Sequence, residues 1–251
     1  MFIFLRLILA HLLADFPFQT SEIYKLKMRN FQGQVLHGMI VAVVSLFILL
    51  PFANNIWVWA ICFFIGITHA ITDWAKVLWT NKKKNGNHFT GFILDQIIHI
   101  SVNFVVFITP LKTITYANTQ SILFNTLYND NNHIIYAISY VIVTFGFTYF
   151  IDTFKMTYFR NTYKSISTKE EITGLFSRGV ILTSIIVTGN FYFFIPLIIA
   201  GEMYLLSPMT LKNRIADLIL GTVPTIFVGI ILRCFLEEVS TCRVCGIFNI
   251  L

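Results

Sequence analysis

Charged residues are scarce in this chain. Only 12% of its 251 residues are Asp, Glu, Lys or Arg, whereas soluble domains carry about 25%. In their place stand hydrophobic residues, 56% of the total with 26 phenylalanines, and the mean hydropathy is +0.74. So little polar surface excludes a soluble globular domain, a disordered chain and a nucleic-acid-binding module. We therefore expect an all-α, polytopic membrane protein.

Cysteine is also scarce, and the four cysteines do not make a disulfide framework. Cys62 and Cys234 lie in apolar runs and are expected to be inert core residues. Cys242 and Cys245 form one Cys-x-x-Cys pair, but a zinc ribbon needs a second pair, which the sequence lacks. The net charge of +6 is not a nucleic-acid signal, because in membrane proteins Lys and Arg mark the loops that stay in the cytoplasm.

Hydropathy predicts eight membrane spans, several shorter than the usual ~20 residues. The first is expected to be a retained helix rather than a signal peptide, because it lacks a basic start and a cleavage site. The predicted spans divide the chain into a first half, residues 1–115, and a second half, residues 116–251. The spans are Phe2–Phe16, Val35–Phe52, Ile56–Trp79, Phe89–Thr109, Ile134–Phe154, Leu175–Thr188, Phe191–Leu206 and Ile215–Leu236.

Basic residues alternate between the loops. The second and sixth loops have no Lys or Arg, and the fourth has only Lys112. The positive-inside rule therefore places the odd loops in the cytoplasm and both termini outside. The odd loops hold Lys25, Lys27, Arg29, Lys82, Lys83, Lys84, Lys155, Arg160, Lys164, Lys169, Lys212 and Arg214.

Seven histidine and aspartate residues lie within the first four predicted spans, where charge is costly and signals function. Six of them form three pairs spaced four residues apart, so each pair shares one helix face. Given the predicted orientations, all seven lie at a similar depth on the cytoplasmic side. They are His11, Asp15, His37, His69, Asp73, Asp95 and His99.

Four imidazoles and three carboxylates in a low-dielectric region favour a metal site, because a divalent cation offsets the buried negative charge. Mixed His and Asp ligation suits zinc, manganese or iron better than calcium or magnesium. Seven ligands are too many for one tetrahedral ion and about right for two ions with open positions for water, so the site is expected to hold one or two ions. Two ions roughly 3.5–4 Å apart can activate water and hold a phosphate oxygen. The alternative is a proton relay or ion path. Against it, the outer halves of the second to fourth spans have no ionisable residue, and Arg6 in the first is interpreted as snorkelling outward.

Other polar residues near these seven could handle an anionic substrate. Lys76 lies one turn beyond Asp73, and Lys27 and Arg29 lie in the first loop. Gln19 and Gln96 flank the candidate ligands and could orient them. The alternative for the cations is topology and contact with lipid headgroups.

The second half is less informative. Arg178 and Glu202 share the predicted cytoplasmic depth and could pair, and Asp152 and Asp217 fall at cytoplasmic helix ends. Asp152-Thr-Phe-Lys155 resembles Asp73-Trp-Ala-Lys76, with Thr148 where a histidine would stand.

These motifs resemble a bacterial membrane family known as domain of unknown function 3307. The resemblance rests on His11-Leu-Leu-Ala-Asp15-Phe-Pro-Phe-Gln19, His37, His69-Ala-Ile-Thr-Asp73-Trp-Ala-Lys76 and Asp95-Gln96-Ile-Ile-His99, over about the first 110 residues. It implies no established reaction. It implies that the His/Asp set is the family's signature.

The first functional hypothesis is an integral membrane, metal-dependent hydrolase of the bacterial cytoplasmic membrane. Its substrate would be a phosphate ester or anhydride at the cytoplasmic face: a phospholipid, a polyprenyl phosphate or a nucleotide. Asp15, Asp73 and Asp95 are its candidate catalytic residues. The alternatives are a metal-ion or proton transporter, and a membrane adaptor or signalling protein with a structural metal site.

Overall fold

A computed structural model shows a chain built from helices, with no strand among the residues it describes. The structure describes residues 1–82, 88–117, 122–160, 163, 166–187, 191–206 and 211–248, and side chains only to residue 235. Two compact units are present. Unit 1 is Met1–Val141 with Met156–Phe159, and unit 2 is Ile142–Lys155 with Arg160–Leu251.

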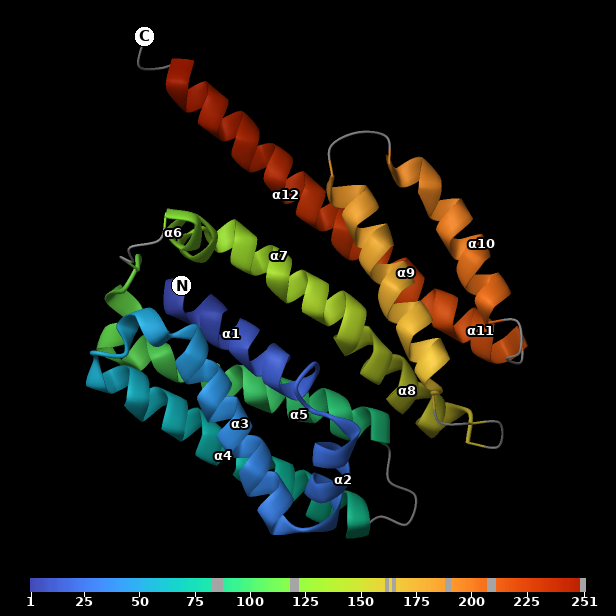
Figure 1. Ribbon diagram of the computed structural model, residues 1–251, viewed down its shortest axis with the longest axis horizontal. Coiled ribbons are helices and arrows are strands. Elements are labelled where there is room, and N and C mark those ends of the chain that lie inside the picture. Colours follow the sequence, from blue (N-terminus) through green and yellow to red (C-terminus); the bar gives the residue numbers. More distant parts are fainter. Residues whose placement is uncertain are drawn as a thin grey trace. The chain divides into compact units, whose positions relative to one another are not determined.

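Unit 1 contains the four helices that carry the His and Asp residues (Figure 1). Helix α3 packs against α1, α2 and α4, and α4 also packs against α5. The short helices η1, η2, η3 and α6 connect these elements or extend them. In chain order the elements are α1 (Phe2–Asp15), α2 (Ser21–Arg29), α3 (Phe31–Ile48), η1 (Leu50–Phe52), α4 (Ile56–Lys82), α5 (His88–Val102), η2 (Asn103–Ile108), η3 (Pro110–Thr113), α6 (Ile122–Asn129) and α7 (Asn131–Val141).

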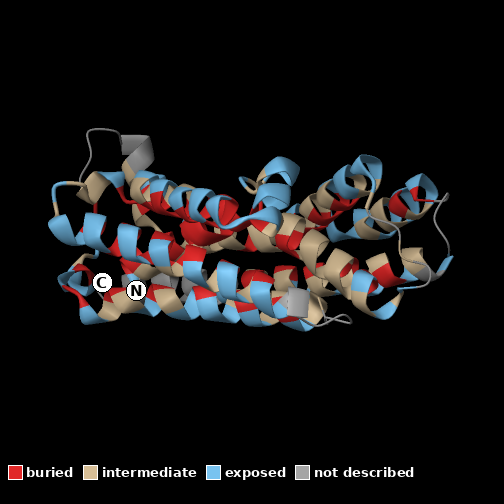
Figure 2. Cartoon of the chain, turned by 90° about the horizontal axis from the view of Figure 1, so that it is seen from below, coloured by how far each residue is buried: buried red, intermediate tan, exposed pale blue. Residues whose placement is uncertain are grey.

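Five helical segments are long and apolar enough to cross a membrane, which indicates a membrane protein. Between 28% and 44% of their residues are buried, so most of each segment faces outward with apolar side chains. Figure 2 shows this as buried stripes on helices whose other faces are exposed. The five segments are Phe31–Ile48, Ile56–Trp79, His88–Ile108, Asn131–Tyr158 and Asn213–Phe235.

The other three predicted spans are also helical but do not meet the same criteria. Helix α1 has only 14 residues, about 21 Å at 1.5 Å per residue. Helix α9 (Thr168–Ile186) begins with charged residues, and Phe191–Leu205 is a shorter apolar helix.

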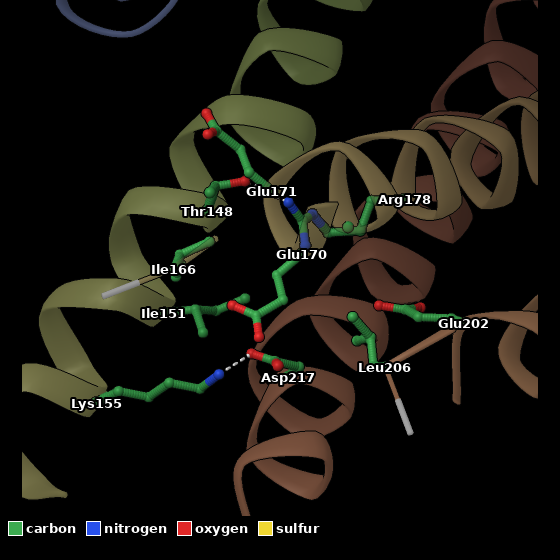
Figure 3. Close-up of a pocket in the computed structure, with 11 residues that line it drawn as sticks. Thr148, Ile151, Lys155, Ile166, Glu170, Glu171, Arg178, Glu202, Leu206 and Asp217 are labelled. Atoms are coloured by element: carbon green, nitrogen blue, oxygen red, sulfur yellow. Dashed lines mark hydrogen bonds and ion pairs between the residues drawn. The ribbon is translucent and has the colours of Figure 1, made fainter. Parts of the chain in front are cut away.

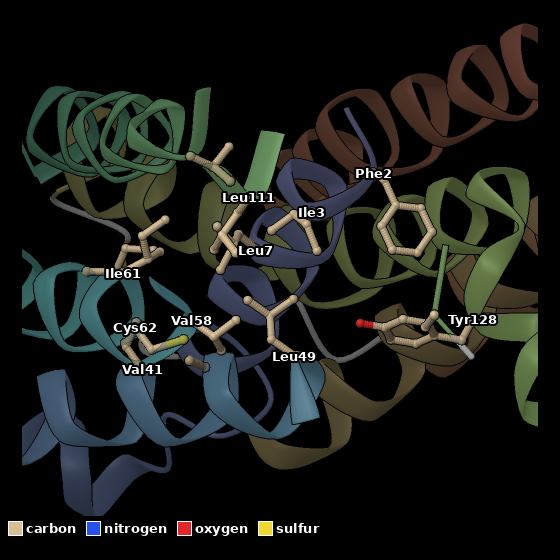
Figure 4. Packing of buried hydrophobic residues seen from close by; sticks show 14 residues of the cluster. Phe2, Ile3, Leu7, Val41, Leu49, Val58, Ile61, Cys62, Leu111 and Tyr128 are labelled. Carbon is tan, nitrogen blue, oxygen red and sulfur yellow. The ribbon is translucent and has the colours of Figure 1, made fainter. Parts of the chain in front are cut away.

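Helix α1 is enclosed by its neighbours, with eleven of its residues buried. Its apolar side chains Phe2, Ile3 and Leu7 belong to the main core cluster, together with residues of α3, α4 and η3 (Figure 4). The expectation that Arg6 snorkels outward is wrong, because its side chain is fully buried. It donates to Asn131 Oδ1 at 2.8 Å and to the carbonyl of Tyr128, and its guanidinium lies 3.3 Å from the Phe2 ring centroid.

Local caps define where α2 and α3 begin. Thr20 accepts a hydrogen bond from the Ile23 amide, and Asn30 accepts one from the Gly33 amide at 2.8 Å. A Cβ on Gly33 would lie 2.3 Å from the Leu26 carbonyl oxygen. The chain can therefore turn back sharply between α2 and α3 only because residue 33 is glycine.

Small residues let α3 and α4 approach closely, as in other membrane helix pairs. A Cβ on Gly38 would lie 2.5 Å from the Gly66 carbonyl oxygen, and one on Gly66 would lie 2.8 Å from Ala42 Cβ. These positions adjoin His37 and His69, whose ring centroids are 4.9 Å apart. The close crossing thus positions two of the candidate ligands.

Of the two cysteines predicted to lie in the core, one is buried and the other is exposed. Cys62 is buried in the core of unit 1, as expected. Cys234 is exposed, so its assignment to the core is wrong: the apolar run it belongs to turns this position outward. Cys242 and Cys245 lie outside the described side chains.

Unit 2 contains two π-helical segments, each of which interrupts a longer helix. Arg178 donates to the carbonyls of Val143 and Thr144, both in the first π-segment, at 2.8 and 2.9 Å. Such segments release carbonyls from the α-helical pattern, and here an arginine accepts them as partners. The unit's elements are η4 (Ile142–Gly146), α8 (Phe147–Tyr158, partly in unit 1), α9, η5 (Phe191–Phe194), α10 (Ile195–Leu205), α11 (Leu211–Asp217), η6 (Leu218–Thr222) and α12 (Val223–Phe248).

Candidate metal centre

The structure brings the seven ionisable residues of the first half together in one buried cluster. They come from α1, α3, α4 and α5, and each is at most 5% exposed. They form three overlapping groups, and within each group the candidate ligand atoms lie within 4.8 Å of one another. The groups are His11, Asp15 and His69; His37, His69 and Asp73; and Asp15, Asp95 and His99.

Asp15, at the end of α1, is the common partner of two histidines. Its Oδ1 lies 2.9 Å from His37 Nε2 and 3.0 Å from His69 Nε2. Its Oδ2 lies 3.9 Å from His11 Nε2 and accepts a hydrogen bond from Gln96 Nε2 at 2.9 Å. One carboxylate therefore joins side chains from all four helices.

The other two carboxylates face His99 and His69. His99 Nε2 lies 3.2 Å from Asp95 Oδ1 and 3.8 Å from Asp73 Oδ1, and His69 Nε2 lies 3.5 Å from Asp73 Oδ2. The His69 and His99 rings stack with centroids 3.7 Å apart and planes 12° apart. Both imidazoles thus present Nε2 to Asp73.

Close approach here does not mean hydrogen bonding. Both oxygens of Asp73, Oδ1 of Asp95, and Nε2 of His69 and His99 are buried without a partner in hydrogen-bond geometry. Buried polar atoms without hydrogen bonds are costly, and these atoms instead face ionisable groups of the cluster at 2.7–3.8 Å. These nitrogen and oxygen atoms could therefore act as ligands of a metal ion.

Thr72 accounts for the orientation of His99. Its hydroxyl lies 3.0 Å from the Thr68 and His69 carbonyl oxygens, to which it donates, so its oxygen can accept from His99 Nδ1, 3.2 Å away. In a neutral His99 ring with its proton on Nδ1, Nε2 carries a lone pair. That lone pair points at two carboxylates, an arrangement that a cation between them would stabilise.

Two lysines each approach one carboxylate of the cluster. Lys27 Nζ lies 2.7 Å from Asp73 Oδ2, and Lys76 Nζ lies 2.7 Å from Asp95 Oδ2. Lys27 is 4% exposed. Burial opposes its ammonium form, but the nearby carboxylates, Asp73 above all, outweigh burial and raise the pKa of Lys27. Arg29, two residues further along α2, is exposed.

The glutamines lie beside the candidate ligands. Gln96 bonds to Asp15, and its Oε1 lies 3.3 Å from His11 Nε2. Gln19 donates to the Asp15 carbonyl at 2.9 Å and accepts from Lys27 Nζ at 3.0 Å. The contacts of the two glutamines fix the orientation of groups that would face a metal.

Sequence reasoning missed three supporting features. One is α2 itself, which carries Lys27 from a predicted loop into the cluster, although Thr20 before Glu22 signals a helix start. The second is Gln34, which donates to the Lys27 carbonyl at 3.0 Å. The third is Thr72, whose position directly before Asp73 gave no sign of its bond to α5.

Unit 2 has a separate polar cluster. Glu202 and Arg178 are each 4% exposed, and Lys155 forms an ion pair with Asp217 (Figure 3). Arg178 and Glu202 do not form the expected ion pair within the described part of the chain. Arg178 instead donates hydrogen bonds to Val143, Thr144 and Thr148. The cavity that these residues line measures about 20 Å³, room for about one water molecule. It is too small to hold a substrate.

Comparison with known proteins places the cluster within a family. No curated protein and no solved structure matches the chain. One family profile matches residues 3–128, half of the chain and the part that contains all seven His and Asp residues. The chain therefore belongs to the family described as Protein of unknown function (DUF3307).

Proposed function

We propose that the protein is an integral membrane, metal-dependent hydrolase that cleaves a phosphate ester or anhydride at the cytoplasmic face of a bacterial cytoplasmic membrane. The proposal rests on one observation: histidine and aspartate side chains from four helices converge in a buried cluster whose ligand atoms could hold a metal ion. Histidine and aspartate together suit zinc, manganese or iron.

Charge supports one ion more than two. Three carboxylates and two lysines leave one net negative charge when the histidines are neutral. One divalent cation brings the cluster to a single positive charge, whereas two would leave three positive charges in a buried region. We therefore favour a mononuclear site.

The chemistry follows from the residues around that site. A divalent cation lowers the pKa of bound water and polarises a phosphoryl oxygen. Asp15, Asp73 and Asp95 are the carboxylates of the described cluster, and we assign the role of general base to one of them. Lys76 is positioned to neutralise charge on a phosphate, because its side chain is 29% exposed beside Asp95.

The topology in this proposal has eight spans with both termini outside, in two halves, 1–115 and 116–251. Basic odd-numbered loops support it. The substrate is a phospholipid, a polyprenyl phosphate or a nucleotide, all of which place a phosphate at the depth predicted for the cluster.

Elemental analysis of detergent-purified protein tests the proposal, together with a His69→Ala/Asp73→Ala double variant. About one equivalent of zinc, manganese or iron is expected, lost in the variant while the protein stays monodisperse. A screen of phosphorylated lipids and nucleotides follows. Absence of metal after supplementation during growth would overturn the hydrolase proposal.

One observation favours a second candidate, a proton or ion transporter. The cluster also reaches neutrality without metal if a single histidine is protonated, because Lys27 and Lys76 already neutralise two carboxylates. A transporter would move protons or metal ions in proteoliposomes, and replacing His69 would stop that flux.

A further inference from the structure

The lysines and a metal would compete for the same carboxylates. Lys27 and Lys76 each lie 2.7 Å from an oxygen of Asp73 or Asp95. Asp73 and Asp95 belong to different candidate ligand groups, but an oxygen of each lies within 3.8 Å of His99 Nε2, where one cation could contact both. A divalent cation bound to these carboxylates would therefore weaken both ion pairs.

Weakening the ion pairs deprives each ammonium group of the carboxylate that it faces. Lys27 is almost completely buried, so its ammonium cannot turn to bulk water for compensation. Lys76 is 29% exposed and can be reached from the surface. Lysine binds phosphate oxygens as a point charge. Once their contacts with Asp73 and Asp95 have weakened, the two ammonium groups would attract an oxyanion beside the metal.

The net charge gives the order of binding. With neutral histidines, the metal-free cluster carries one negative charge and repels an anion, whereas with one divalent cation it becomes positive and attracts one. Binding energies are reciprocal, so an anion that needs the metal also tightens it.

We propose that Lys27 and Lys76 are exchangeable counter-ions: metal binding at Asp73 and Asp95 releases them and forms a phosphate-binding subsite, so that metal and phosphate bind cooperatively. This inference rests on the proposed metal site and adds a coupling that the site alone does not require.

Manganese affinity of the full-length protein in detergent, with and without inorganic phosphate, tests the coupling. Electron paramagnetic resonance reports free Mn²⁺. Saturating phosphate is expected to tighten manganese binding by at least about fivefold, and phosphate is expected not to bind the metal-free protein. Manganese binding that phosphate leaves unchanged would overturn this inference and leave the metal site intact. No manganese binding would overturn the metal site itself.

Replacing the lysines provides a second test of the coupling between metal and phosphate. Lys76→Met is expected to bind manganese more tightly in the absence of phosphate, because a competitor is gone, and to lose most of the phosphate effect. Lys27→Met should behave in the same way. If that variant does not fold because Lys27 is buried, Lys76→Met still tests the proposal, because Lys76 is partly exposed and its replacement should be tolerated. Lys25→Met, exposed on the same short helix as Lys27, is the control and should retain full coupling. Coupling that survives in Lys76→Met would contradict the proposal.

Nanodiscs distinguish the source of the phosphate. The same titration is made in phosphatidylcholine discs with and without phosphatidic acid. Coupling to phosphatidic acid identifies a lipid phosphomonoester, and coupling to inorganic phosphate alone identifies a soluble anion. Coupling to neither overturns the inference.

Discussion

Asp15 has a different position in the cluster from the other two carboxylates. Lysines neutralise Asp73 and Asp95, whereas Asp15 faces histidines and Gln96. It also belongs to two of the three ligand groups. At the scale of single residues, Asp15 thus carries the negative charge that remains uncompensated.

Asp15→Asn is therefore expected to weaken manganese binding by about 100-fold or more, beyond the 10–100-fold loss typical of residues that only orient ligands. The amide keeps the shape of the carboxylate, so the protein should stay folded and monodisperse. Chelator competition measures the affinity. Asp152→Asn is the control, because Asp152 bonds to Tyr163 in the second half of the chain. Equal affinities in the two variants would exclude Asp15 as a ligand.

Gln96 is expected to act through Asp15 and His11, not on the metal. Gln96→Leu removes its bond to Asp15 and should weaken metal binding about 10–100-fold. Gln96→Glu can still contact His11 and should recover part of that loss, which a purely structural role would not predict. Ser101→Ala, on an exposed position of the same helix, should bind metal normally. An unchanged affinity in Gln96→Leu would remove Gln96 from the site.

The helix pairs explain why part of the site was predictable. The spacing of four residues within α1, α4 and α5 is local, so sequence alone pairs His11 with Asp15, His69 with Asp73 and Asp95 with His99. Contacts between helices are not local. The approach of Lys27 to Asp73 depends on the sharp turn at Gly33, and the sequence shows that turn only as a glycine in a loop.

The closest approach of α3 and α4 gives a prediction at the scale of elements. Gly38→Ala would place a methyl group 2.5 Å from the Gly66 carbonyl oxygen, so the helices must separate. Such overpacking costs about 1–3 kcal/mol of unfolding free energy, and metal affinity should fall too, because His37 and His69 move apart. Thermal unfolding in detergent and manganese titration measure the two effects.

Gly91→Ala is the matched control, since a Cβ there meets no heavy atom within 4 Å. It should be neutral or stabilise helix α5 by up to about 1 kcal/mol. If Gly38→Ala behaves like this control, α3 and α4 do not pack as tightly as described.

At the scale of the whole chain, hydropathy found every long helical segment, and all eight predicted spans are helical. Three of them, however, are too short or too charged to qualify as spans. Hydropathy measures composition, whereas α1 is apolar because neighbouring helices enclose it. A buried helix and a lipid-facing helix have the same hydropathy, so sequence alone does not separate them.

The side of the membrane on which the cluster lies can be tested whether or not α1 crosses the membrane. Lys27 contacts Asp73, so the cluster lies on the side of the first basic loop. Four of the five long apolar segments separate Lys25 from Lys169, and one separates Lys25 from Asn54. Cysteines at 25 and 169 should therefore share one side and a cysteine at 54 the other. Basic residues near 25 and 169 predict that their side is the cytoplasm.

Single-cysteine variants in a background without Cys62, Cys234, Cys242 and Cys245 measure this with a membrane-impermeant maleimide. Asn54→Cys should react in intact cells, and Lys25→Cys and Lys169→Cys only after permeabilisation. The reversed pattern would place the His/Asp cluster at the outer face. A cytoplasmic nucleotide could then no longer reach Lys76, and a phospholipid or polyprenyl phosphate of the outer leaflet would become the favoured substrate.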